Sequence, residues 1–227
     1  MGGFTLFQNR HCADHKAQMA RQLAAMRGQG FDEPDELVAG DSLLVVYPKL
    51  ISPVENIRTF PNGDFVAVCG TFYYQGKTGF RGLEQIYVDF APAEIDKGSL
   101  ETEPLPEPLR GTYVCFVQKS GRLWVFTDRI GFYKVYETRG GEVLTSSFLT
   151  AIACTPAPRL HAQCVYEYVF QGAMYGSETI IQGVRQFRPD SLLVLENTRG
   201  RKCSRPNLSQ PLIENRPLNE HCERIGA

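Results

Sequence analysis

The segment from Asp64 to Tyr74 reads DFVAVCGTFYY and is apolar at almost every position. A strand with one solvated face alternates apolar and polar residues, whereas a strand covered on both faces is a continuous apolar run. The segment therefore predicts a strand that lies between two layers of structure. A chain of 227 residues is long enough to bury such a core in a single domain.

Several further segments have the lengths and residue types of strands. The N-terminal segment GFTLFQ alternates apolar and polar residues, and Ser120-Gly121 and Gly140-Gly141 are turn signals between short β-prone runs. We expect an antiparallel meander after residue 111, with residues 3–8 and 64–74 together in one sheet and residues 112–127 in a second. The predicted strands are 3–8, 42–47, 64–74, 112–118, 122–127, 134–137, 143–147 and 191–196.

Three segments predict helices. The first runs from Asp14, a candidate N-cap, to Arg27, and Gly28 ends it. Shorter helices are expected over residues 147–153 and 162–171, the latter with one apolar face. The apolar residues at helical spacing in the first helix are Ala17, Met19, Ala20, Leu23, Ala24 and Met26. Strands interleaved with a few helices predict an α+β fold of two stacked, mainly antiparallel sheets with helices on the outer faces.

Charge and hydropathy exclude some classes of function. The formal net charge is −1, and basic and aromatic residues do not alternate along a stripe, so we expect no nucleic-acid partner. No apolar run approaches the ~20 residues that cross a bilayer, and the N-terminus lacks the layout of a secretion signal, so we expect no membrane partner and a cytoplasmic location.

The seven cysteines point to reduced thiols, mostly in the core, because there is no secretion signal and no C-x-x-C pair. Cys69 and Cys115 lie in predicted strands and are expected to be buried. His11 and His15 are four residues apart but have no regular third and fourth ligand. We therefore predict no metal site.

The order of short signatures resembles the class II glutamine amidotransferase domain of asparagine synthetases, which has the N-terminal nucleophile hydrolase fold. The resemblance covers about residues 2–197. It implies a domain over residues 1–197 and a polar tail or linker over 198–227 that leads toward a synthetase domain. The matching signatures are Arg27-Gly28, Cys69-Gly70-Thr71-Phe72-Tyr73, Asp128-Arg129-x-Gly131, Ser146-Ser147, Tyr166-x-x-x-Phe170-x-Gly172, Thr179-Ile180 and Phe187-x-Pro189.

The same resemblance implies a degenerate active site. Active members begin Met-Cys-Gly-Ile, and removal of Met exposes a cysteine nucleophile, whereas here Gly2 occupies that position. Cys69-Gly70 stands where the family has the Asn-Gly of the oxyanion hole, and Lys49 stands where it has the arginine that holds the substrate carboxylate. The family's Arg-Gly-Pro-Asp survives only as Arg27-Gly28. We therefore predict no catalytic residue.

Two other candidate sites have structural interpretations. Cys12 exposed by cleavage is an alternative nucleophile, but it precedes a helix, whereas the strand that should follow the nucleophile begins at Gly3. Asp128 and Arg129 follow a strand and precede Gly131, a residue free to adopt positive φ. We interpret them as a local ion pair and a turn cap rather than as catalytic groups.

Two classes of function follow. The first is a non-hydrolysing amidotransferase-like domain that serves an ATP-dependent, amide-forming synthetase of the asparagine synthetase type. The second is a small-molecule or peptide binding or assembly module built on the former glutamine pocket. The chain has no S-G-G-x-D-S pyrophosphate loop, so ATP and Mg²⁺ are expected only in a partner synthetase domain or chain and no cofactor in this one. A homodimer is compatible with either class.

Overall fold

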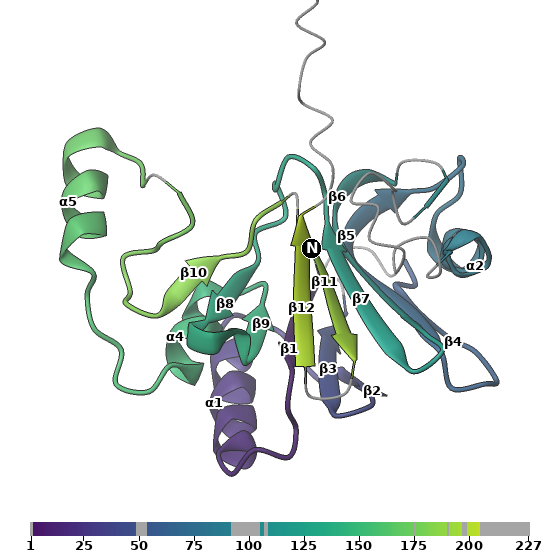
Figure 1. The fold of residues 1–227 in the computed structure, drawn as a ribbon, viewed down its shortest axis with the longest axis horizontal. Coiled ribbons are helices and arrows are strands. Elements are labelled where there is room, and N and C mark those ends of the chain that lie inside the picture. The colour runs from purple at the N-terminus through teal and green to yellow at the C-terminus, as the bar shows by residue number, and fades with distance from the viewer. Residues whose placement is uncertain are drawn as a thin grey trace, which may run out of the picture.

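The computed structural model describes residues 2–48, 54–91, 105–106, 109–174, 176–189, 191–196 and 199–204. These residues form two six-stranded antiparallel sheets (Figure 1). The first has the order β10-β8-β9-β1-β3-β2 and the second β12-β11-β7-β6-β5-β4. The strands of the first sheet are β1 (Gly3–Phe7), β2 (Asp35–Ala39), β3 (Ser42–Tyr47), β8 (Tyr136–Thr138), β9 (Val143–Thr145) and β10 (Val184–Gln186). Those of the second are β4 (Ile57–Thr59), β5 (Phe65–Tyr73), β6 (Arg110–Lys119), β7 (Arg122–Thr127), β11 (Ser191–Glu196) and β12 (Arg199–Ser204).

Buried residues fall into clusters that define the layers. The cluster between the sheets joins Phe4 and Leu44 of the first sheet to Phe116 and Val125 of the second. On the outer face of the first sheet, Val45 packs with residues of α1 and α4. On the outer face of the second, residues of α2 pack on β5, β6 and β7. The helices are α1 (His15–Arg27), α2 (Gly79–Asp89), α4 (Phe148–Cys154) and α5 (Ala162–Gln171). The predicted fold of stacked antiparallel sheets with outer helices is therefore confirmed.

The apolar segment from Asp64 to Tyr74 contains β5. Its residues from Phe65 to Gly70 are all buried, because the second sheet has the inter-sheet core on one face and α2 on the other. The prediction that this strand shares a sheet with residues 3–8 is wrong, however. β5 pairs with β6 along its whole length, from Phe65 opposite Gln118 to Tyr73 opposite Arg110, and so lies in the second sheet rather than beside β1.

The predicted meander is also divided between the sheets. β6 and β7 pair in the second sheet, and the chain then crosses to the first, where β8 and β9 pair through a turn at Arg139–Gly141. Period-two patterns predict strands but do not say which sheet each strand joins. The loop from Asp128 to Tyr133 makes the crossing.

Helix α1 has the predicted extent but not the predicted face. Its buried residues are Gln18, Gln22 and Met26, whereas Ala17, Ala20 and Ala24 are exposed. Gln22 is fully buried because its Oε1 accepts hydrogen bonds from Thr5 Oγ1 at 3.3 Å and from Tyr47 Oη at 3.0 Å. A satisfied amide can replace an apolar contact, which the apolar spacing did not indicate. Asp14 precedes the helix but makes no side-chain cap.

Five elements are not predicted from the sequence: the short strands β2, β4 and β10, helix α2 and strand β12. Helix α2 contains Gly79 and Gly82, which lower helix propensity. A Cβ at Gly82 would stand 2.8 Å from Phe72 Cε2, so glycine allows the helix to lie close to β5. Strand β12 pairs with β11 from Ser191 opposite Ser204 to Glu196 opposite Arg199, inside the segment predicted as tail or linker. The rest of that tail, residues 205–227, and most of the Pro- and Glu-rich segment 91–108 lie outside the described residues.

Candidate functional site

The N-terminal segment lies in the middle of the first sheet. β1 pairs with β3 on one side and with β9 on the other, and this places Gly2 at the buried end of a central strand. The carbonyl oxygen of Gly2 accepts a hydrogen bond of 2.6 Å from Tyr133 Oη. The carbonyl oxygen of Gly3 accepts one from Cys69 Sγ at 3.7 Å. Residues from both sheets therefore meet at the start of the chain.

Tyr133 is held in place by the crossing loop. Both carboxylate oxygens of Asp128 accept backbone hydrogen bonds, Oδ1 from Phe132 N at 3.0 Å and Oδ2 from Tyr133 N at 2.9 Å. Asp128 is only 3% exposed, and Gly131 has a φ of 70°. The predicted turn cap is thus confirmed, and the loop it closes positions the tyrosine on Gly2.

Burial raises the pKa of Tyr133 well above its ordinary value, and the nearby Cys69 acts in the same direction. A hydrogen bond with Ser146 opposes the shift. The tyrosine is therefore a neutral hydrogen-bond donor at physiological pH and not a base.

Ser146 and the residues around it enclose the next position. Phe4 N donates a hydrogen bond of 3.0 Å to Ser146 Oγ, and Ser146 N donates one of 3.1 Å to the carbonyl of Phe4. A Cβ at Gly3 would stand 2.6 Å from Met26 Cε and 3.3 Å from both Phe31 Cζ and Ser146 Oγ. Glycine is therefore the residue that fits at position 3 without movement of these side chains.

The structure brings together three of the five predicted site residues: Gly2, Cys69 and Gly70. Gly70 follows Cys69 on β5 with a φ of 103°, and a Cβ there would stand 3.0 Å from Tyr133 Cδ2. Arg27 is exposed in the last turn of α1. Burial raises the pKa of Tyr47, while the hydrogen bond with Gln22 and the positive charge of Arg27 oppose that shift. Lys49 lies outside the described residues.

Tyr133 and Ser146 were not predicted from the sequence as parts of this cluster. Ser146 was noted only as the start of a helix, which Ser147 in fact caps by accepting a hydrogen bond from Thr150 N. Tyr133 lies five residues after Asp128. An aspartate at the end of a strand can cap the loop that follows, and this is the sequence signal that could have pointed to Tyr133. That the loop ends on Gly2 depends on contacts across 131 positions of sequence.

The chemistry available to the cluster is limited because Gly2 has no side chain. Covalent acyl transfer needs a nucleophile beside a base, and glycine offers neither a thiol nor a hydroxyl. The neighbouring side chains present the hydroxyls of Tyr133 and Ser146 and the thiol of Cys69, which is 0% exposed. These groups donate hydrogen bonds to the carbonyls of Gly2 and Gly3 and to nearby backbone, so they fix the N-terminal strand.

A separate polar cavity of about 530 Å³ lies between β8, β10 and the segment before α5. Its lining residues are Glu137, Thr138, Gly140, His161, Glu178, Gln182, Gly183 and Arg185. Arg185 Nε and Glu178 Oε1 form an ion pair of 2.6 Å there. Glu137 adds a second carboxylate to the lining, beside the pair of opposite charges.

Within the described ranges, no three His, Cys, Asp or Glu side chains are grouped so as to hold a metal ion. In the same part of the chain, no helix has both the length and the apolar character needed to cross a membrane.

Thiol reactivity should follow burial. We expect iodoacetamide to modify Cys12, which is partly exposed, well before Cys69, Cys115 and Cys154, which are buried. Burial raises the pKa of Cys154 from 9.0 to about 11, so little reactive thiolate forms at pH 8. Since the folded pKa is the higher one, the contribution of Cys154 to stability is present below pH 9 and lost as pH rises toward 11. Mass spectrometry of digests taken at successive times would measure the order in which the cysteines are modified. Rapid labelling of Cys69 in the native protein would contradict the predicted order.

The described residues define an αββα protein with a glycine at the head of a central strand. No family profile and no curated protein matches the sequence. Among solved structures, the chain is similar to a glutamine phosphoribosylpyrophosphate (PRPP) amidotransferase from B. subtilis complexed with ADP and GMP, with 9% identity and a TM-score of 0.46. It is also similar to a structure described as the allosteric regulatory enzyme of purine biosynthesis, with 11% identity and a TM-score of 0.44. In each case 90% of this chain and 49% of the other is covered, so the chain spans about half the length of those proteins.

Proposed function

We propose that this chain is a class II glutamine amidotransferase-like domain that does not hydrolyse glutamine. In this proposal it serves an ATP-dependent, amide-forming synthetase of the asparagine synthetase type, on the same polypeptide or on a partner chain. ATP and Mg²⁺ would bind the synthetase and not this domain. The amine would come from a substrate, so ammonia from glutamine would not be needed.

The observation that carries the proposal is the position of Gly2. In the family that the sequence resembles, the nucleophile is the first residue of the mature chain and precedes a strand. Gly2 precedes β1 and is buried, Cys69 of the facing sheet contacts the carbonyl of Gly3, and Gly70 lies against Tyr133, which donates to the carbonyl of Gly2. The resemblance in signature order and the meeting of these residues in space support the same assignment independently.

The surroundings of Gly2 support the lack of hydrolysis. The Cys69 thiol donates to the Gly3 carbonyl, so it is engaged with the backbone of β1. A thiol is also a weaker donor than the amide of asparagine, and loss of one oxyanion-hole donor costs about 3 kcal/mol of transition-state stabilisation. A cytoplasmic location is part of the proposal, supported by the thiol state of Cys12, Cys154 and Cys164.

The purified chain should release no ammonia from glutamine above background. Loss of a nucleophile typically lowers turnover by about 10⁶-fold, so the expected rate is below detection, and a diazo-ketone analogue of glutamine should leave no covalent adduct. Gly2→Cys alone should restore little activity. Gly2→Cys combined with Cys69→Asn and Lys49→Arg should restore more, because it also rebuilds the oxyanion donor and the carboxylate-binding fork.

Two results would count against the proposal. An adduct on Cys12 or Cys69 of the unaltered protein, together with ammonia release, would mean that the nucleophile lies elsewhere. The adjoining coding sequence tests the synthetase association: a reading frame with an S-G-G-x-D-S loop would support it, and its absence would favour a binding module on the same scaffold.

A further inference from the structure

Helix α5 turns its apolar face toward solvent. At 100° per residue, Val165, Tyr166, Tyr168, Val169 and Phe170 fall on one broad face centred on Val169. The exposed fractions are 61% for Tyr166, 69% for Val169 and 79% for Phe170. The residue of α5 that is buried, Cys164, lies on the opposite face. Amphipathic helices of globular proteins normally have the reverse orientation.

No other described helix or strand packs extensively against α5. In Figure 1 it lies at the edge of the molecule, beyond β8 and β10 and away from both sheets. A helix of 10 residues is too short to be stable in water by itself, and such helices depend on packing of an apolar face. The exposed face of α5 is therefore expected to be covered by another surface.

The N-terminal end of α5 is tied to the segment that precedes β10. His161 N donates 2.8 Å to the carbonyl of Ile180, and Gln182 N donates 2.8 Å to that of Arg159. His161 also caps the helix, because its Nδ1 accepts a hydrogen bond from Cys164 N. Gly172, with a φ of 68°, ends it. The start of the helix is thus held against residues 180–182.

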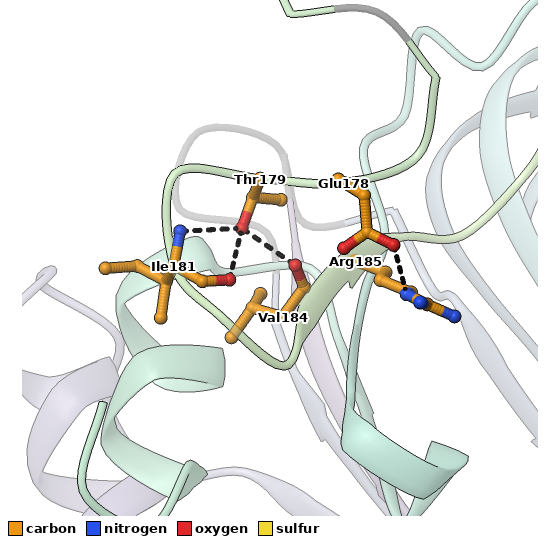
Figure 2. A network of polar contacts seen from close by, with 5 residues as sticks. All are labelled: Glu178, Thr179, Ile181, Val184 and Arg185. Carbon is orange, nitrogen blue, oxygen red and sulfur yellow. Dashed lines mark hydrogen bonds and ion pairs between the residues drawn. The ribbon is translucent and has the colours of Figure 1, made fainter. Parts of the chain in front are cut away.

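Figure 2 shows the polar contacts that hold the segment leading into β10. Thr179 is 3% exposed, and its Oγ1 accepts a hydrogen bond from Ile181 N and lies 2.8 Å from the carbonyl of Val184, to which it donates. The ion pair between Glu178 and Arg185 ties the start of this loop to β10. Since these contacts already hold residues 178–185, little further conformational entropy of this segment is lost when a partner covers α5.

We propose that the apolar face of α5 is the interface of a homodimer, in which two copies of the helix pack across a twofold axis. This inference does not depend on the proposed function. A twofold interface brings the same patch of each copy together, and an apolar patch is complementary to itself. Glu167, the charged residue of α5, lies on the opposite face, and the net charge of −1 produces little repulsion between copies.

The available area suits such a dimer. An aromatic side chain buries about 150–250 Å², and three aromatic residues of this face, Tyr166, Tyr168 and Phe170, are more than half exposed. With Val169, each copy offers roughly 500 Å² of apolar surface. Two copies would then bury about 1,000 Å², which is near the lower limit for a specific interface. We therefore expect a dimer with a dissociation constant on the order of micromolar.

Sedimentation equilibrium of the full chain, from submicromolar to about 100-fold higher concentration, measures this association. The unaltered protein should pass from monomer to dimer, and Val169→Glu should weaken dimerisation by about 100-fold, because it places a charge at the centre of the apolar face. Val88→Glu is the matched control. Val88 is 70% exposed on α2, so that change should leave the dimer intact.

Circular dichroism should show that both variants remain folded. As a second measurement, Val169→Cys should be cross-linked to the same residue of a second copy by a short bis-maleimide, with the linked peptide identified by mass spectrometry, and Val88→Cys should not. A monomer at every concentration, or equal effects of the two glutamate variants, would overturn the proposal. So would a monomer that loses binding to a synthetase partner when Val169 is changed, because α5 would then be covered by that partner.

Discussion

Replacement of Gly70 by alanine is expected to destabilise the protein by more than about 3 kcal/mol. The φ of Gly70 is 103°, a value that L side chains rarely adopt, and a Cβ there would stand 2.1 Å from the carbonyl oxygen of Thr112. Thr112 belongs to the neighbouring strand, so relief of the clash requires β5 and β6 to separate. Urea unfolding, with the midpoint and slope both fitted, would measure the loss.

Gly121→Ala provides the control for conformational strain alone. Gly121 also has a positive φ, 78°, but its Cβ would meet nothing within 4 Å. That change should cost about 1–2 kcal/mol, the usual penalty for a left-handed L residue. If Gly70→Ala were no more destabilising than Gly121→Ala, the close contact between β5 and β6 would not be the cause.

Asp128→Ala is expected to cost about 3–5 kcal/mol. The carboxylate is buried and accepts hydrogen bonds from two backbone N–H groups, those of Phe132 and Tyr133. Hydrogen bonds to charged groups contribute about 1.5–3 kcal/mol each, and the N–H of Tyr133 would remain buried without its acceptor. The loop that places Tyr133 on Gly2 should loosen, which limited proteolysis would detect as new cleavage between residues 128 and 133.

Two further substitutions, one at Asp128 and one at Arg129, distinguish a loop cap from an ion pair. Asp128→Asn keeps one acceptor oxygen and should fall between the unaltered protein and the alanine variant. Arg129→Ala alters an exposed neighbour and should cost less than about 1 kcal/mol. An equal loss from Asp128→Ala and Arg129→Ala would indicate that an ion pair, rather than the loop cap, stabilises this turn.

Local patterns in the sequence were sufficient for most secondary structure. Ser42–Tyr47, Arg122–Thr127, Ala162–Gln171 and Ser191–Glu196 have the predicted bounds, because each run ends at turn residues or a helix-ending glycine. Helix α2 was missed because Gly79 and Gly82 are unfavourable in an isolated helix, and only the close approach to Phe72 explains them.

The candidate site was predicted in part. Of the residues that resemble a known motif, Cys69 contacts the carbonyl of Gly3, and Gly70 lies against Tyr133, which donates to the carbonyl of Gly2. Their role in a site stays a prediction. Tyr133 and Ser146 were not predicted as their neighbours. Tyr133 lies in the loop that crosses between the sheets, and Ser146 follows β9, whose pairing with β1 no local pattern encodes.

The sequence by itself determined that β5 is covered on both faces and that two layers of antiparallel strands stack. These properties follow from residue identity and short-range periodicity, which act within a few positions of the chain. Only the tertiary structure decided that β5 pairs with β6, that Gln22 rather than alanine faces the core, and that α5 turns its apolar side outward. Each of these depends on which distant surface is available for burial or hydrogen bonding, and that is fixed only when the whole chain has folded.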